Sequence, residues 1–139
     1  MSTINTGKVV SGGLVAGLIM NISEYILNEP VLGTQMAAIM TERNLPAIGG
    51  SAIGVFVVMT FILGIFTIWL YAAIRPRYGA GVNTAICAGL AVWFTAYLLP
   101  SISFQVLGFM PMNMITIVVV WGAVEMMVAS VAGAYFYSE

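Results

Sequence analysis

The most unusual chemical feature of this sequence is a carboxylic acid inside an apolar segment. Glu125 lies near the middle of residues 113–137, about 18 Å of α-helix from either end at 1.5 Å per residue. A carboxylate at the centre of a bilayer is costly, so such a residue is a candidate for proton or ion chemistry. Helical spacing places it on one stripe with Gly122 and Ala129, where a neighbouring helix can approach closely. We therefore expect Glu125 to face the interior of a helical bundle.

A second acid belongs to a polar stripe on an earlier apolar segment. The members of this stripe follow one another at steps of three and four residues and so share one helix face: Gly13, Gly17, Asn21, Glu24 and Asn28. The two glycines form a GxxxG pattern, which is typical of close packing between membrane helices. The stripe predicts a packing surface that turns into a polar network toward one end.

The two acids have no evident cation to pair with, because no basic residue lies inside an apolar segment. Burial without a cation favours the protonated carboxyl, so we expect Glu125 to donate a hydrogen bond to Asn21, Thr60, Thr95 or Glu24. Three interpretations stay open. The network fixes helix register, it forms a proton relay or substrate site, or it contacts a pigment, a lipid or a partner subunit.

Residues that usually carry catalysis are scarce. The sequence has no His and no Asp, and Cys87 is its only cysteine. These absences exclude a Ser-His-Asp triad, a His-containing zinc site, imidazole haem ligation and an internal disulfide. We expect no enzymatic activity, no cofactor and no metal site.

Composition identifies the elements that must position these residues. Only 6% of the 139 residues are charged and 61% are hydrophobic, whereas soluble domains carry about 25% charged residues. This excludes a soluble enzyme, a nucleic-acid-binding protein and a disordered chain. A bilayer core of about 30 Å requires about 20 apolar residues per helix. Four segments qualify and predict an all-α, antiparallel transmembrane bundle that forms one domain over residues 1–139: about 9–32, 51–74, 82–99 and 113–137.

The connections between these spans differ in character. Residues 33–50 include several apolar side chains at 36–40 followed by the polar Thr41, Glu42 and Arg43, which predicts a short amphipathic helix at the membrane interface. Residues 100–111 carry no charge, and we expect them to pack into the headgroup region or against a partner. Residues 75–81 form a tight turn, so spans two and three are antiparallel neighbours.

Basic residues orient the chain. Lys8 precedes the first span, and Arg75 and Arg77 lie between spans two and three. The positive-inside rule then predicts a cytoplasmic N-terminus and, after four spans, a cytoplasmic C-terminus. Only Arg43 falls outside. We expect Lys8, Arg75 and Arg77 to anchor this orientation at lipid headgroups.

Three segments together resemble a known group of proteins. They are Asn21-Ile-Ser-Glu24, the stretch Trp69-Leu-Tyr-Ala-Ala-Ile-Arg75-Pro-Arg77-Tyr-Gly79, and the Trp-Gly-x-x-Glu of Trp121 to Glu125. The chain is similar over nearly its whole length to a group of small four-span bacterial integral membrane proteins to which no activity is assigned. The resemblance implies a bacterial cytoplasmic-membrane location and no particular activity.

The sequence leads to one functional hypothesis and two rivals. The first is a non-enzymatic accessory or structural subunit of a larger membrane complex, or a homo-oligomer, in contact with membrane lipids and without nucleic acid. The alternative is a small oligomeric proton-coupled transporter or channel that uses Glu125 and Glu24. The third and weaker possibility is a lipid- or pigment-binding membrane module.

Overall fold

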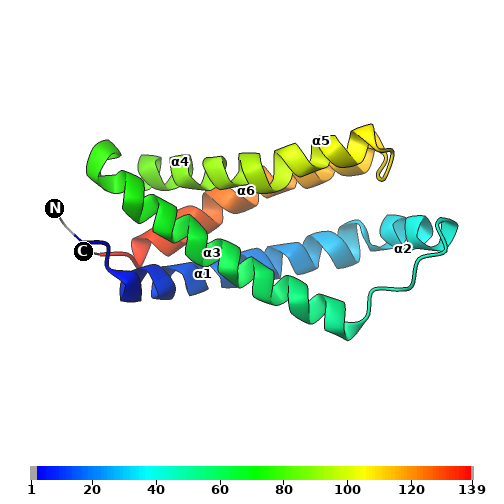
Figure 1. Ribbon diagram of the computed structural model, residues 1–139, viewed down its shortest axis with the longest axis horizontal. Helices are drawn as coiled ribbons and strands as arrows, with labels where there is room; N and C mark the ends of the chain where they lie inside the picture. Colours follow the sequence, from blue (N-terminus) through cyan, green and yellow to red (C-terminus); the bar gives the residue numbers. More distant parts are fainter. Residues whose placement is uncertain (1–2, 139) are drawn as a thin grey trace.

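The computed structural model describes residues 3–138, and these form helices joined by non-helical connections, with no strand among them (Figure 1). The predicted domain of residues 1–139 therefore extends beyond the described part at residues 1–2 and 139. The elements in chain order are α1 (Thr6–Ile26), the π-helix η1 (Leu27–Val31), α2 (Gly33–Glu42), α3 (Gly50–Tyr78), α4 (Val82–Trp93), the π-helix η2 (Phe94–Leu98), α5 (Leu99–Val106) and α6 (Met112–Tyr135).

The predicted all-α architecture with four spans is confirmed. Four continuous helical segments are long and apolar enough to cross a membrane, and they pack against one another: Thr6–Val31, Gly50–Tyr78, Val82–Val106 and Met112–Tyr135. The predicted short helix in the first long connection is α2. In Figure 1, α3 crosses α1, while α4 and α5 run alongside α6.

Two span ends differ from the sequence prediction because proline does not end either helix. Span two continues past Pro76 to Tyr78, so only residues 79–81 form the turn between α3 and α4. Span three continues through Pro100 to Val106 instead of ending near residue 99. Proline lacks the N–H that an α-helix needs. Just before Pro100, η2 widens the turn, and Leu99 N–H donates to the carbonyl of Phe94, five residues earlier.

Glycines bring α1 and α3 together at their crossing. A Cβ atom added to Gly17 would lie 2.9 Å from Cα of Phe61, and one added to Gly64 would lie 2.6 Å from the backbone nitrogen of Gly17. Gly13 packs equally closely against the backbone of Ile65. The GxxxG pattern predicted as a packing surface is therefore the contact between these two helices.

Helix α6 forms the centre of the bundle and is also approached through small residues. A Cβ atom added to Gly133 of α6 would lie 2.7 Å from the carbonyl oxygen of Gly12 in α1. A Cβ atom added to Gly89 of α4 would lie 2.6 Å from the carbonyl oxygen of Met126 in α6. Ala129 lies in the core and is fully buried. These contacts place α1 and α4 against α6 and hold its middle, which carries Glu125, inside the bundle.

The N-terminal part of α1 and the C-terminal part of α6 lie at the same end of the bundle, called the inner end here (Figure 1). Aromatic side chains pack together at this end. Arg75 lies over the ring of Tyr137, 5.4 Å from its centroid, and Tyr71 meets the same ring edge-on at 6.0 Å. The backbone N–H of Asn5 donates to the hydroxyl of Tyr137 over 3.3 Å. Lys8 and Arg77 are exposed at this end. Three predicted topology anchors therefore share one end, as the orientation hypothesis requires.

At the opposite, outer end the two long connections contact each other. The Nη2 atom of Arg43 donates to the carbonyl oxygen of Gly108 over 2.6 Å, and its guanidinium lies 5.4 Å from the centroid of Phe109. Asn113 donates to the side chain of Gln35 over 3.4 Å. The Arg43 contacts join the C-terminal end of α2 to the loop between α5 and α6, and the Asn113 contact joins α2 to the first turn of α6, so α2 has a defined position.

Candidate functional site

The two predicted acids meet on one tyrosine. The hydroxyl of Tyr97 lies 2.6 Å from Oε1 of Glu125 and 3.1 Å from Oε1 of Glu24. Glu125 comes from α6 and is 4% exposed, Glu24 is half-buried near the end of α1, and Tyr97 belongs to η2. Three elements that are distant in sequence therefore build one site, which we name the carboxyl cluster.

Local backbone features position each member. The ring of Tyr97 lies against Gly122, where an added Cβ atom would come within 2.9 Å of Cε1 of the ring. Gly122 is one helical turn before Glu125, so its missing side chain admits the tyrosine beside the acid. The extra residue in the π-helical turn of η2 changes the direction in which Tyr97 points, and π-turns of this kind occur often at functional sites.

A further set of hydrogen bonds extends the cluster toward the outer end. The Nδ2 atom of Asn28 donates to Oε2 of Glu24 over 2.8 Å and to its backbone carbonyl over 2.9 Å. One residue before Glu24, the hydroxyl of Ser23 accepts a hydrogen bond of 2.8 Å from Nε1 of Trp121. The cluster is thus held at the α1–α6 contact and reaches the first residues of η1.

The number of hydrogens in the cluster limits its protonation. A tyrosine hydroxyl carries one hydrogen and cannot donate it in two linear bonds. For both contacts to be hydrogen bonds, the hydroxyl must donate to one carboxyl and accept from the other, which must then be protonated. The second oxygen of Glu125, Oε2, is buried and has no hydrogen-bond partner among the described residues. The cluster therefore has more acceptor atoms than its own hydrogens can satisfy.

Some predicted partners of Glu125 are wrong. The side chains of Asn21, Thr60 and Thr95 donate to main-chain carbonyl oxygens instead. Glu24 does belong to the site, but Tyr97 connects it to Glu125. Of the two asparagines predicted in the network, only Asn28 contacts a cluster member by its side chain.

Sequence reasoning did not find Tyr97. The available signal was a tyrosine inside span three, three residues before Pro100. Helical periodicity assumes 3.6 residues in every turn, whereas the π-helical turn of η2 contains an extra residue. The direction of the Tyr97 side chain therefore could not be predicted from periodicity.

The donor atoms of the site are oxygens from carboxyl and hydroxyl groups. Within residues 3–138, no group of three or more His, Cys, Asp or Glu side chains is placed to hold a metal ion. The arrangement is chemically suited to hold and move protons, since each member both accepts and, when protonated, donates a hydrogen bond.

Comparisons of the chain with protein-family models, with curated proteins and with solved structures give no match. The geometry of the carboxyl cluster and of the surfaces around it therefore indicates what the chain can do.

Proposed function

We propose that this chain is a small non-enzymatic integral membrane protein of the bacterial cytoplasmic membrane that couples proton uptake and release to transport and works as an oligomer. Glu125 is the titrating group and Glu24 assists it. The observation that carries the proposal is the placement of one tyrosine hydroxyl between two carboxyls inside an apolar bundle. Four helices of suitable length and apolar character are compatible with the membrane location.

Proton exchange explains the cluster better than a passive structural tie does. A hydrogen bond that only holds two helices together can be made by neutral groups, and the Trp121–Ser23 hydrogen bond already connects α1 and α6 in this way. Carboxyls inside a membrane are costly and typically mark proton relays. A buried polar network stabilises a fold most when every polar atom in it is hydrogen-bonded, whereas Oε2 of Glu125 has no hydrogen-bond partner among the described residues.

The exposure of the three groups suggests a route. Glu24 is half-buried near the outer end and Glu125 is almost fully buried. Tyr97 contacts both acids, so it can accept a proton from one carboxyl while it donates its own to the other. In this proposal protons reach Glu125 through Glu24 and Tyr97.

The test is proton flux in proteoliposomes with an entrapped pH-sensitive dye and an imposed potential. We expect the wild-type protein to give pH-dependent flux and Glu125→Gln to abolish it. The amide keeps a hydrogen bond to Tyr97 but does not titrate. Glu42→Gln is the matched control, because Glu42 is exposed at the end of α2 and outside the cluster.

Equal flux from wild type and Glu125→Gln, or wild-type flux no greater than that of empty liposomes, would contradict the proposal. Both variants must show the same oligomeric state as wild type, so that lost flux is not explained by lost assembly.

A second candidate function is that of an accessory or structural subunit of a larger complex, or a homo-oligomer without transport. It is favoured by the first half of α3, which leaves the bundle (Figure 1) and exposes apolar side chains around its circumference, including Ile53, Phe56 and Met59. Native purification in mild detergent with mass spectrometry tests it. A stable monomer with no co-purifying membrane protein would contradict this candidate.

A further inference from the structure

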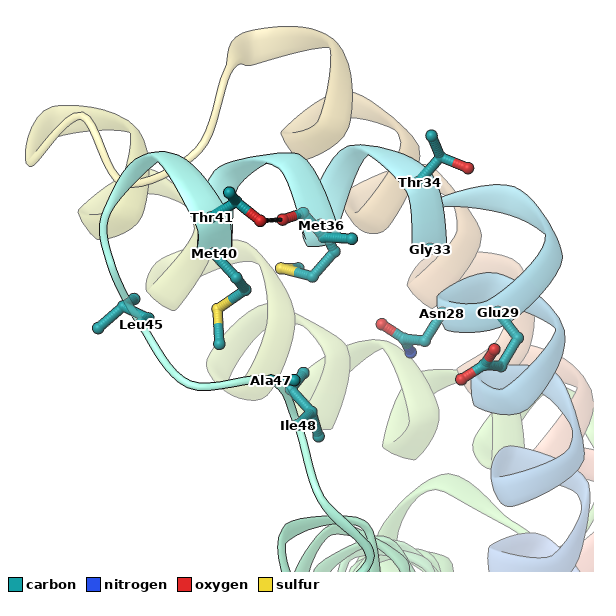
Figure 2. Close-up of a pocket in the computed structure, with 11 residues that line it drawn as sticks. Asn28, Glu29, Gly33, Thr34, Met36, Met40, Thr41, Leu45, Ala47 and Ile48 are labelled. Carbon is teal, nitrogen blue, oxygen red and sulfur yellow. Dashed lines mark hydrogen bonds between the residues drawn. The ribbon is translucent and has the colours of Figure 1, made fainter.

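A pocket lies at the outer end, between η1, α2 and the segment that leads to α3. Its volume is about 560 Å³, within the range of about 300–1,000 Å³ that is usual for small-molecule sites. Figure 2 shows Met36 and Met40 on one side and Asn28 and Glu29 facing them from η1, with Leu45 and Ile48 completing the wall. We call this the outer pocket.

The lining of the outer pocket combines one charge with apolar surface. Glu29 is its only charged residue, Asn28, Thr34 and Thr41 add polar groups, and the other lining side chains are aliphatic or thioether. Methionine side chains are flexible and polarisable, so they adapt to apolar groups of different shape. Arg43, the basic residue among those described at this end, does not line this pocket and instead contacts Gly108 and Phe109.

The outer pocket adjoins the carboxyl cluster directly. Asn28 lines the pocket and donates to Oε2 of Glu24, and Glu24 contacts the Tyr97 hydroxyl, which also contacts Glu125. A charge placed in the pocket is therefore separated from Glu24 by a single side chain.

We infer that the outer pocket binds a lipophilic organic cation, such as a protonated amine or a quaternary ion with apolar substituents, with Glu29 as its counter-ion. Carboxyls of Glu29 and nearby Glu24 attract a cation and repel an anion, and the apolar wall accommodates the substituents. This inference rests on the proposed function and names its substrate class.

Cation binding in the pocket must also affect the proton. A positive charge beside Glu24 favours its ionised form, and by reciprocity a deprotonated cluster binds the cation more tightly. The titratable groups that face Glu24 from the neighbouring elements are Tyr97 of η2 and Glu125 of α6. The cation and the proton therefore compete through one cluster, as coupled exchange requires.

Equilibrium dialysis of radiolabelled tetraphenylphosphonium against the purified full chain in detergent tests the inference. We expect saturable binding by wild type and an affinity lower by roughly tenfold in Glu29→Gln. Glu42→Gln, which removes the same charge at the same end but outside the pocket, should bind like wild type. A second variant, Ala47→Trp, fills the pocket from an exposed segment and should also lose binding while Glu29 is intact.

The absence of saturable binding by wild type, or equal affinities for Glu29→Gln and Glu42→Gln, would overturn the inference. Its failure is distinguishable from failure of the proposed function. Proton flux that depends on Glu125 without phosphonium binding rejects the pocket assignment alone. Phosphonium binding that depends on Glu29, in a protein without proton flux, supports the pocket and rejects proton coupling.

Discussion

At the scale of single residues, Tyr97 joins two separate acids into one site. Without the tyrosine hydroxyl, Oε1 of Glu125 would lose its hydrogen bond of 2.6 Å, and Glu24 would lose the contact of 3.1 Å through which Tyr97 connects it to Glu125 on α6. A buried polar group that loses its partner costs about 1–3 kcal/mol. The hydroxyl is therefore expected to matter for both stability and proton movement.

Substitution of Tyr97 by Phe removes this hydroxyl and keeps the ring against Gly122. We expect the detergent-solubilised variant to melt at a lower temperature than wild type, with a loss of about 1–3 kcal/mol in the free energy of unfolding. Tyr25→Phe is the control, because Tyr25 is 68% exposed on the outside of α1. Equal melting temperatures for the two variants, measured by circular dichroism, would contradict the role given to Tyr97.

The acids themselves could be predicted from the sequence and the tyrosine could not. An intramembrane carboxyl is rare, so the position of Glu125 inside an apolar segment is enough to identify it. Helical spacing predicts it beside Gly122 and Ala129 on an inward face, and all three are buried in the structure. Tyr97 depends on the local winding of η2. A π-turn is a response to backbone constraints near Pro100 and leaves no periodic signature in the sequence.

At the scale of elements, close approach of backbones at glycine fixes the crossing of α1 and α3, and therefore where Glu24 lies. The GxxxG pattern predicted this surface, but the sequence did not indicate which helix would meet it. The partner is α3 through Gly64, as the contacts with Gly13 and Gly17 show. The predicted second and third spans end before Pro76 and Pro100, whereas the structure accommodates both prolines within helices.

Substitution of Gly17 by Val tests the crossing. Its first side-chain atom would lie 2.9 Å from Cα of Phe61, so α1 and α3 must separate, and overpacking of this kind costs about 1–3 kcal/mol. Gly54→Val adds the same side chain to α3 at a position with no neighbouring atoms within 4 Å. We expect thermal melting in detergent to show a clear loss for Gly17→Val and little change for Gly54→Val. The reverse order would refute the packing argument.

At the scale of the whole molecule, the two ends of the bundle have different chemistry. The inner end carries Lys8, Arg75 and Arg77, while the half of the bundle toward the outer end carries Glu24, Glu29 and Glu42 with Arg43. An even number of spans brings both termini to the same end, and the positive-inside rule predicts that this end is cytoplasmic.

Reporter fusions at the C-terminus test this orientation in bacterial cells. We expect a fused green fluorescent protein to be fluorescent and a fused alkaline phosphatase to be inactive, because only the former folds to its active form in the cytoplasm. An active phosphatase would place the C-terminus and the basic inner end outside the cytoplasm and the outer pocket on the cytoplasmic side, which is the reverse of the proposed orientation.

The most direct test of proton exchange at the carboxyl cluster is infrared difference spectroscopy of the membrane-reconstituted protein between acidic and alkaline pH. We predict a carbonyl stretching band of a protonated, buried carboxyl that decreases as the pH rises. This band should be present in wild type and in Glu42→Gln and absent in Glu125→Gln. A spectrum without such a band in wild type, or a band unchanged in Glu125→Gln, would contradict the claim that Glu125 titrates.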